Sequence, residues 1–264
     1  MLKGAIHIHS TYSDGEFTLS ELRKLFLSEG CAFACMTDHA ESFDEGTLVK
    51  YMDECRGLSD SGFCFVPGLE FACEQQMHVL GYGATRLART KNPHQIIQHI
   101  EEQSAISVIA HPKTEHFPWI ETFEVLPRGI EAWNSKYDGR YAPRPETFAL
   151  LQRLRARVPQ TLAFYGQDLH WKEQFHRLFV RVNSDRIDPE EILLALSRGT
   201  YQGQWDELEL PSSGVLPEEI FDRFAKERRK SDRIRAWAKS SKRILDSVGL
   251  KIPSSVRSRL RRIF

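Results

Sequence analysis

Two histidines stand near the start of the chain, in the stretch GAIHIHSTYSDG, where a buried strand would ordinarily carry aliphatic residues. In an extended strand, residues i and i+2 point to the same face, so His7 and His9 should lie side by side. Two neutral imidazoles placed in this way are natural ligands for a borderline metal such as zinc, and Asp14 lies just beyond them. Taken alone, the pair would suit two structural histidines without a metal equally well.

The elements that must position these residues alternate between strand and helix over the first 200 residues. Thr18 and Glu21 form a capping-box pattern before an apolar stripe that ends at Gly30, which is typical of a helix. Strands are predicted at 4–9, 31–39, 63–73, 78–83, 107–112, 129–134, 161–170 and 176–184, and further helices at 45–60, 93–103, 143–157 and 188–199. This alternation predicts an α/β fold with a mostly parallel sheet, and about seven such units favour a small or irregular barrel.

Polar residues recur where the predicted strands end. They are His7, His9, Asp38, His39, Glu70, His111, Asn134, Asp168 and His170, and His78 begins the strand that follows Glu70. In a parallel barrel the C-terminal ends of all strands meet at one face. Burying so many ionisable groups without a counter-charge would be prohibitive, which favours a metal site over a set of structural histidines. One tetrahedral ion cannot use so many ligands, so we expect two or three ions, with Glu70 able to bridge them.

The motifs HIHSTYSDG, MTDH, GLE, HVLGYG, AHP, GIEAWN and GQDLH, in this order, resemble the PHP (polymerase and histidinol phosphatase) family of metal-dependent phosphoesterases over roughly residues 3–175. The resemblance implies a distorted (β/α)7 barrel, similar to a TIM barrel, with a trinuclear site at the strand C-termini. It implies three ligand sets, which are His7, His9, Glu70 and Asp168; Glu70, His78 and His111; and Asp14, His39 and His170.

Two features depart from the family pattern. The last motif usually reads Gly-Ser-Asp-Ala-His, and here Gln167 and Leu169 replace the Ser and the Ala, so that a bulky Leu169 would reshape the pocket. Some members insert a small nucleotide-binding cap between the positions of His78 and His111. Only 32 residues separate the two histidines here, so no such cap is expected.

The resemblance implies hydrolysis of a phosphate ester, and the ligand set would carry it out with a metal-activated hydroxide at a tri- or dinuclear site, with Zn, Mn or Fe favoured over Mg. The candidate catalytic residues are His39, His111 and Asp168, and either one of the histidines or a metal-bound water would protonate the leaving group. The candidate substrate-binding residues are Asn134, Lys113, Lys136 and Arg140. The expected substrate is a small phosphomonoester. The alternatives are a nuclease or phosphodiesterase that uses the basic tail, a hydrolase of another electrophile, and a non-catalytic metal-stabilised docking module.

The bulk composition narrows the class of protein. With 41% hydrophobic and 27% charged residues, the chain has the composition of a soluble globular protein. No apolar run is long enough to span a bilayer, and the first strand starts almost at Met1, so no secretory signal is expected. An odd number of cysteines favours a cytoplasmic location, and we interpret them as small buried hydrophobic residues. They are Cys31, Cys35, Cys55, Cys64 and Cys73.

The net charge of zero conceals a basic C-terminal segment. Residues 215–264 hold 15 Lys and Arg against 6 Asp and Glu, a net charge of +9, and the remainder carries −9. We therefore divide the chain into a barrel at 1–205 and a basic, mostly helical extension at 206–264. A long helix is predicted from Pro217, with an apolar stripe of Ile234, Trp237, Ile244, Leu245 and Val248. It would either pack on the barrel or bind an anionic membrane, nucleic acid or a partner protein.

Overall fold

The computed structural model describes residues 1–139 and 141–247, without the side chains of 231 and 234–247. Within these residues, twelve strands form two sheets of six. The first has the order β12 (Leu208–Pro211), β11 (Tyr201–Trp205), β10 (Leu178–Val182), β1 (Leu2–Ile8), β2 (Phe33–Met36), β4 (Cys64–Val66). The second has the order β3 (Asp38–His39), β5 (Gly68–Ala72), β6 (His78–Tyr82), β7 (Ile106–Ala110), β8 (Gly129–Asn134), β9 (Leu162–Gly166).

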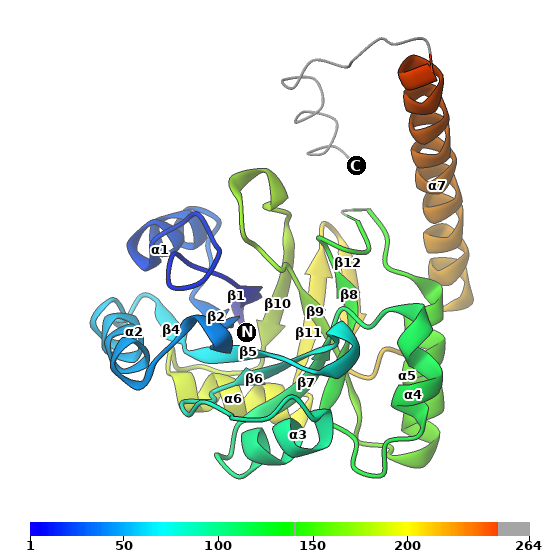
Figure 1. Cartoon of the computed structure of the whole chain (residues 1–264). Coiled ribbons are helices and arrows are strands. Elements are labelled where there is room, and N and C mark those ends of the chain that lie inside the picture. The colour runs from blue at the N-terminus through cyan, green and yellow to red at the C-terminus, as the bar shows by residue number, and fades with distance from the viewer. Residues whose placement is uncertain (140, 248–264) are drawn as a thin grey trace.

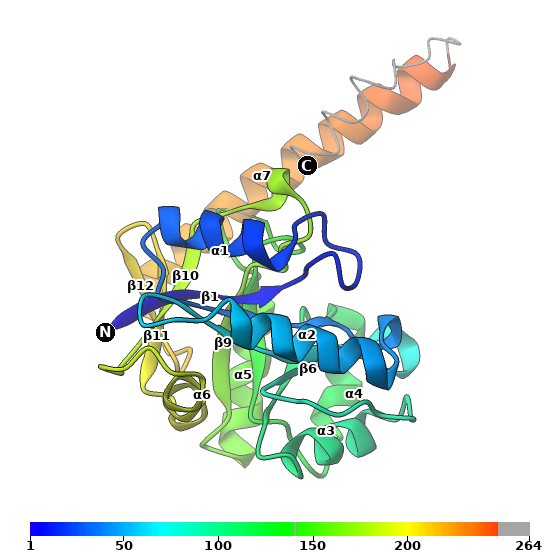
Figure 2. The same ribbon diagram turned by 90° about the vertical axis from the view of Figure 1, so that its left-hand side faces the viewer.

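The helices surround these sheets, apart from one that projects away (Figures 1 and 2). They are α1 (Leu19–Ser28), α2 (Glu45–Gly57), α3 (Pro93–Glu101), α4 (Phe117–Glu121), α5 (Pro145–Arg157), α6 (Pro189–Arg198) and the projecting α7 (Glu218–Ser247). Short 3-10 turns lie at Ala40–Ser42, Glu74–Gln76, Thr114–His116 and Lys172–Gln174. The predicted capping box is confirmed, because the Thr18 side chain accepts from the Glu21 N–H and the Glu21 carboxylate accepts from the Thr18 N–H.

The sheets are mixed, so the prediction of a mostly parallel sheet is wrong for half of the strand pairs. Five of the ten pairings are parallel and five are antiparallel. The connection from β5 to β6 covers only residues 73–77, too short for a parallel crossover. Because β6 runs antiparallel to β5 and β7, its first residue, His78, pairs with Ala72 and Ala110 at the C-terminal ends of those strands.

The two sheets adjoin but do not form one closed sheet, so the α/β fold is established and the (β/α)7 barrel is not. The chain passes between the sheets from β2 to β3 and from β4 to β5. The segment after β9 also hydrogen-bonds to β1, since the Leu169 N–H donates to the His7 carbonyl (3.2 Å) and the His9 N–H to the Leu169 carbonyl (3.0 Å). The strand end carrying His7 and His9 therefore lies beside the segment carrying Asp168.

The interior of the fold agrees with part of the sequence analysis. All five cysteines are buried and none forms a disulfide, which confirms their interpretation as small hydrophobic residues. Leu169 is fully buried within the hydrophobic core, although we expected its side chain to reshape the pocket. Among the described helices, none combines the length and the apolar composition that crossing a membrane requires.

The first turns of α7 pack on the body. Phe224 is fully buried, with its ring centroid 5.8 Å from that of Trp133, and Phe221 meets Phe148 at 5.4 Å. Arg228 donates to the backbone carbonyl of Asp138. The contacts with the body that the structure describes come from these first turns, and packing of the predicted apolar stripe on the domain stays a prediction. The predicted boundary after residue 205 falls between β11 and β12, which pair with each other, and the domain division stays a prediction.

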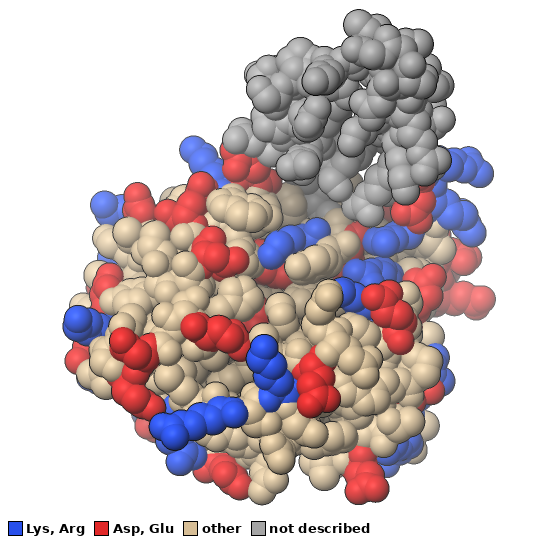
Figure 3. Space-filling model, in the orientation of Figure 1, with Lys and Arg blue, Asp and Glu red and all other residues tan. Residues whose placement is uncertain are grey.

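Several cationic side chains lie close together on α7, between residues 226 and 233. Lys226, Arg229, Lys230 and Arg233 line one hollow. On the face of the body in Figure 3, by contrast, residues of both signs are interspersed. The predicted apolar stripe lies outside the described side chains, and Val248 lies outside the described residues. The predicted membrane, nucleic-acid and protein partners therefore stay predictions.

Replacing Phe224 with alanine should lower the free energy of unfolding by about 3 kcal/mol, because it removes a buried aromatic ring from between α7 and the body. Urea denaturation followed by circular dichroism measures this change. Val215→Ala, at a position that is 58% exposed, should change the same quantity by less than about 0.5 kcal/mol. Equal effects of the two substitutions would contradict the packing of α7 on the body.

Candidate metal centre

Glu70 lies at the centre of a cluster of histidines where the two sheets adjoin. Its Oε1 is 2.7 Å from Nδ1 of His78 and 3.1 Å from Nε2 of His111. Its Oε2 is 3.2 Å from Nε2 of His7 and 3.1 Å from Nε2 of His9. One buried carboxylate thus faces imidazoles through both of its oxygens, which is the arrangement that bridging two cations requires.

Asp168 lies on another side of the same histidines. Its Oδ1 is 3.8 Å from Nε2 of both His7 and His9, and 3.2 Å from Nδ1 of His170. Its Oδ2 is 3.8 Å from Nε2 of His111. Asp168 and Glu70 therefore approach His7 and His9 together, although they are far apart in the sequence.

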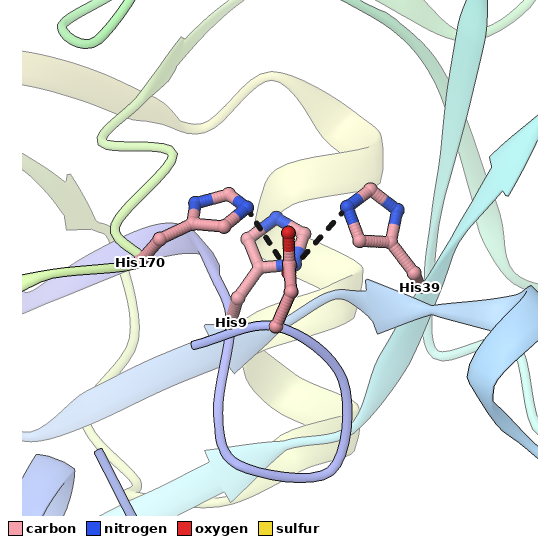
Figure 4. Close-up of side chains that lie close together, drawn as sticks. His9, His39 and His170 are labelled. Carbon is pink, nitrogen blue, oxygen red and sulfur yellow. Dashed lines mark ion pairs between the residues drawn. The ribbon is translucent and has the colours of Figure 1, made fainter. Parts of the chain in front are cut away.

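Asp14 completes the cluster on its open side. Its Oδ1 lies 3.7 Å from Nδ1 of His9, 3.6 Å from Nε2 of His39 and 3.2 Å from Nε2 of His170. Figure 4 shows the three imidazoles of His9, His39 and His170 gathered around one point. The side chain of Asp14 is 54% exposed, whereas those of His9 and His170 are nearly inaccessible, so this edge of the cluster faces solvent.

Among the described residues, three groups bring their ligand atoms within 4.8 Å of one another. The groups are His9, Asp14, His39 and His170; His7, His9 and Asp168; and His7, Glu70 and His111. All nine predicted metal ligands therefore lie in or against one cluster. The grouping differs from the predicted one, because His9 joins the Asp14 group and His7 lies beside Glu70 and His111 where His78 was expected.

The backbone is strained where it presents these side chains. His7 has φ 62°, Asp168 has φ 53° and His111 has φ 27°, in the region that non-glycine residues rarely adopt. The register of β1 against β2 also shifts between Ile6 and Ile8. His7 and His9 do lie together, with ring centroids 5.3 Å apart, but through an irregular strand end and not through the regular alternation that we predicted.

His9 supplies the clearest test of whether these residues suit a cation. Both of its ring nitrogens are buried and neither makes a hydrogen bond of regular geometry, although carboxylate oxygens of Glu70 and Asp14 lie 3.1 Å from Nε2 and 3.7 Å from Nδ1. Burial lowers the pKa of His9 to about 3, so the ring is neutral at pH 7 and offers a lone pair. Buried polar atoms are rarely left without a partner, and a metal ion is one that an imidazole nitrogen can take. The donor set of imidazoles and carboxylates fits borderline divalent ions.

The carboxylates of the cluster are held in their ionised form. Burial alone would raise the pKa of Glu70, but the nearby His7 and hydrogen bonds from His111, His7 and His78 hold it well below its ordinary value. Asp168 is likewise buried, and His7 and Lys136 hold its pKa well below its ordinary value. Burial would lower the pKa of His7, yet the carboxylates of Glu131, Asp168 and Glu70 raise it well above its ordinary value.

Glu131 supports the cluster and was missed by the sequence analysis. Its Oε1 is 2.7 Å from Nδ1 of His7, and its Oε2 accepts from the His111 N–H at 2.7 Å. A Cβ on Gly166 would lie 1.8 Å from Glu131 Oε1, so the glycine makes room for this carboxylate. The sequence indicated its role only through one acidic residue within the predicted apolar strand GIEAWN. Such a carboxylate orients a ligand histidine and strengthens its basicity.

Asp38 shapes the loop that carries Asp14. Its Oδ1 accepts from the Ser10 N–H and from the Ser13 hydroxyl, both at 2.7 Å. The carboxylate is fully buried, and burial raises its pKa. Asp38 was noted at a strand end without an assigned role, and its contacts give it the role of positioning the loop.

The four predicted substrate-binding residues differ in their positions. Lys136 enters the cluster, with its Nζ 3.0 Å from Asp168 Oδ1. Asn134 is buried, and its Nδ2 donates to Glu131 (2.9 Å) and Asp168 (3.0 Å), which positions both. Lys113 contacts Gln76 at 3.3 Å. Arg140 lies outside the described residues. Direct contact of any of these residues with substrate stays a prediction.

The arrangement defines a class of fold, an α/β fold of PHP-like type with a histidine–carboxylate cluster at its strand ends. The same fold occurs in a two-domain protein from Bacteroides vulgatus that contains a predicted PHP-like metal-dependent phosphoesterase, with a TM-score of 0.55 and 16% identity over 85% of this chain and 69% of that one. The resemblance to the PHP family that the motifs indicated is thereby confirmed at the level of the fold.

Two further solved structures are similar with lower scores. One is a proposed metal-dependent phosphoesterase from Bifidobacterium adolescentis, with a TM-score of 0.49 and 14% identity over 74% of this chain and 96% of that one. The other is an amidohydrolase from Chromobacterium violaceum with bound sulfate and no metal, with a TM-score of 0.47 and 14% identity over 64% and 88%. No family model and no curated protein matches the chain.

The Glu131→Gln variant should bind divalent ions about 10- to 100-fold more weakly, because the amide cannot serve both His7 and the His111 N–H as the carboxylate does. Titration with Mn²⁺ by isothermal calorimetry measures the affinity. Glu124→Gln, which removes the same charge from an exposed position, should leave it unchanged. An unaltered affinity in Glu131→Gln would show that Glu131 does not support the ligands.

Proposed function

We propose that this protein is a metal-dependent phosphoesterase that hydrolyses a small phosphomonoester. The observation that carries the proposal is the convergence of six histidines and three carboxylates on one largely buried cluster. Burying so many ionisable groups is prohibitive without cations to balance them. The motif resemblance and the PHP-like fold of the neighbour from Bacteroides vulgatus agree with a phosphate ester as the substrate.

The proposed cofactors are two or three divalent ions, with Zn, Mn or Fe favoured over Mg by the imidazole ligands. Once bound, the ions would make a water nucleophilic near neutral pH and balance the charge on the phosphate oxygens. Glu70, His7 and His9 would hold the ions at the floor of the site, where all three side chains are nearly inaccessible. The chain itself thereby provides a rigid and dry base for the reaction.

The rim of the site would receive the substrate. The side chains of Asp14, His39 and His78 are 54%, 23% and 26% exposed, and they lie on the side that solvent can reach. His39 is the more exposed of the two candidate proton donors, and it would protonate a leaving alkoxide only if it did not at the same time hold an ion in the Asp14 group. The side chain of His111 is only 9% exposed, and its ring packs against Tyr137 with a centroid separation of 4.5 Å.

Asp168 would act as a ligand and not as a proton donor. Its pKa is held well below the ordinary value, which keeps it ionised at neutral pH. Asn134 would fix its orientation through the hydrogen bond from Nδ2 to Oδ2. Lys136, beside the same carboxylate, is the described cation best placed to attract a phosphate.

The distorted (β/α)7 barrel is part of this proposal. The backbone hydrogen bonds between β1 and residues 167–169 support it, because they bring the first strand against the segment that follows the last strand of the second sheet. We also propose that the protein is cytoplasmic and that the basic extension contacts an anionic membrane, nucleic acid or a partner protein. A nuclease, a non-phosphate hydrolase and a non-catalytic module remain as outcomes of the following test.

Purified protein should contain two to three divalent ions and hydrolyse p-nitrophenyl phosphate faster than bis-p-nitrophenyl phosphate, with activity lost on chelation and restored by Mn²⁺. Elemental analysis and absorbance at the nitrophenolate band measure both. Preference for the diester would indicate the nuclease. Bound metal without turnover of either ester would favour the docking module or another electrophile, and the absence of metal after reconstitution would refute the proposal.

The His9→Ala variant should lose at least about 100-fold in kcat/KM, because His9 belongs to two of the three ligand groups. Its metal content should fall as well. The matched control is His94→Ala, since His94 is exposed on α3 outside the cluster and its loss should change neither quantity. Full metal content and activity in His9→Ala would exclude His9 as a ligand.

A further inference from the structure

Lys136 reaches into the cluster from the loop that follows β8. Its Nζ is 3.0 Å from Asp168 Oδ1 and 3.2 Å and 3.4 Å from the two ring nitrogens of His170. The side chain is 20% exposed, and the Lys136 N–H donates to Oδ1 of Asn134 at 3.1 Å. The loop therefore holds the ammonium group in place from its backbone.

The position of this ammonium group coincides with atoms that a metal ion would use. Asp168 Oδ1, its nearest partner, is the same oxygen that lies 3.8 Å from Nε2 of His7 and of His9. His170, its second partner, belongs to the group formed with Asp14 and His39. Lys136 thus contacts members of two of the three candidate ligand groups, and its hydrogen bonds reach none of the residues of the third, which are His7, Glu70 and His111.

Before substrate binds, the charge of the cluster is better balanced by two divalent ions beside a lysine than by three. Glu70, Asp168, Asp14 and Glu131 contribute four negative charges, and histidines that bind metal are neutral. Three divalent ions together with Lys136 would leave an excess of three positive charges before substrate binds. Two ions with Lys136 leave an excess of one, so the substrate-free site is closer to neutral with two ions than with three.

We propose that the ammonium group of Lys136 takes the place of one divalent ion, so that the site holds two ions and a lysine where the family resemblance implied three ions. This inference rests on the proposed metal site and specifies its composition. The lysine is a fixed positive charge beside the phosphate, and it repels a further cation from the position between Asp168 and His170.

The number of bound ions tests the inference directly. Wild-type protein, reconstituted with excess Mn²⁺ and freed of unbound ions by gel filtration, should contain two ions per chain by elemental analysis. Lys136→Met, which removes the charge and keeps the length, should contain three. Calorimetry should show the additional ion binding to this variant at least about 10-fold more tightly than to the wild type.

Two controls separate charge from shape. Lys136→Arg retains the positive charge and should bind two ions. Lys113→Met removes a lysine that contacts Gln76 instead of the cluster, and it should also bind two. Three ions in the wild type, or two in Lys136→Met, would overturn the inference. Because the methionine could impair folding, Lys136→Gln provides a second neutral variant, and a far-ultraviolet circular dichroism melt verifies that each variant is folded.

The outcomes also distinguish this inference from the proposed function. If the wild type binds two ions and hydrolyses phosphomonoesters, but Lys136→Met also binds two, only the role of Lys136 is wrong. If the wild type binds ions without hydrolysing any ester, the ion count still tests Lys136 while the proposed activity is refuted. If the wild type binds no ions, both proposals are overturned.

Discussion

The cost of burying carboxylates among histidines is the constraint on which the rest of this structure depends. Glu70 and Asp168 are each 1% exposed, and a buried charge is tolerated only when other groups compensate for it. Every nearby element contributes to this compensation. Strand β1 supplies His7, the residue that follows this strand is His9, β6 supplies His78, and the segments after β7 and β9 supply His111 and His170. Contacts between charged and polar side chains, as well as apolar packing, therefore join the two sheets at these edges.

The strained backbone at these edges is held by contacts from distant parts of the chain. His7 adopts a positive φ while its carbonyl accepts from the Leu169 N–H and its ring contacts Glu131. The strained His111 donates its N–H to the same Glu131. Strained backbone conformations of this kind persist only where several independent contacts from the surrounding structure hold them in place. One buried glutamate thus links two strained ligands, and the small Gly166 beside it is part of that arrangement.

The sequence revealed the chemistry of the site better than its geometry. Histidines and acids at strand ends are conspicuous because burial penalises them, and with the motif resemblance this allowed all nine candidate ligands to be named. Glu131 was overlooked because it lies inside a strand, and only the structure shows that His7 approaches it. The antiparallel pairing of β6 and the hairpin of β11 and β12 were also missed. Periodicity shows which residues are buried, but the choice of neighbouring strand depends on contacts between distant segments.

The basic extension and the cluster share a structural support. The loop after β8 carries Lys136, and Asp138 anchors it by accepting from the Asn134 N–H at 3.1 Å and by pairing with Arg144 at 2.5 Å. Arg228 of α7 donates to the carbonyl of the same Asp138. The first turns of α7 therefore bear on the loop that positions a cation in the cluster. Because Asn134 and Lys136 beside the same Asp138 both contact Asp168, a short chain of hydrogen bonds and ion pairs connects the packing of α7 with the cluster.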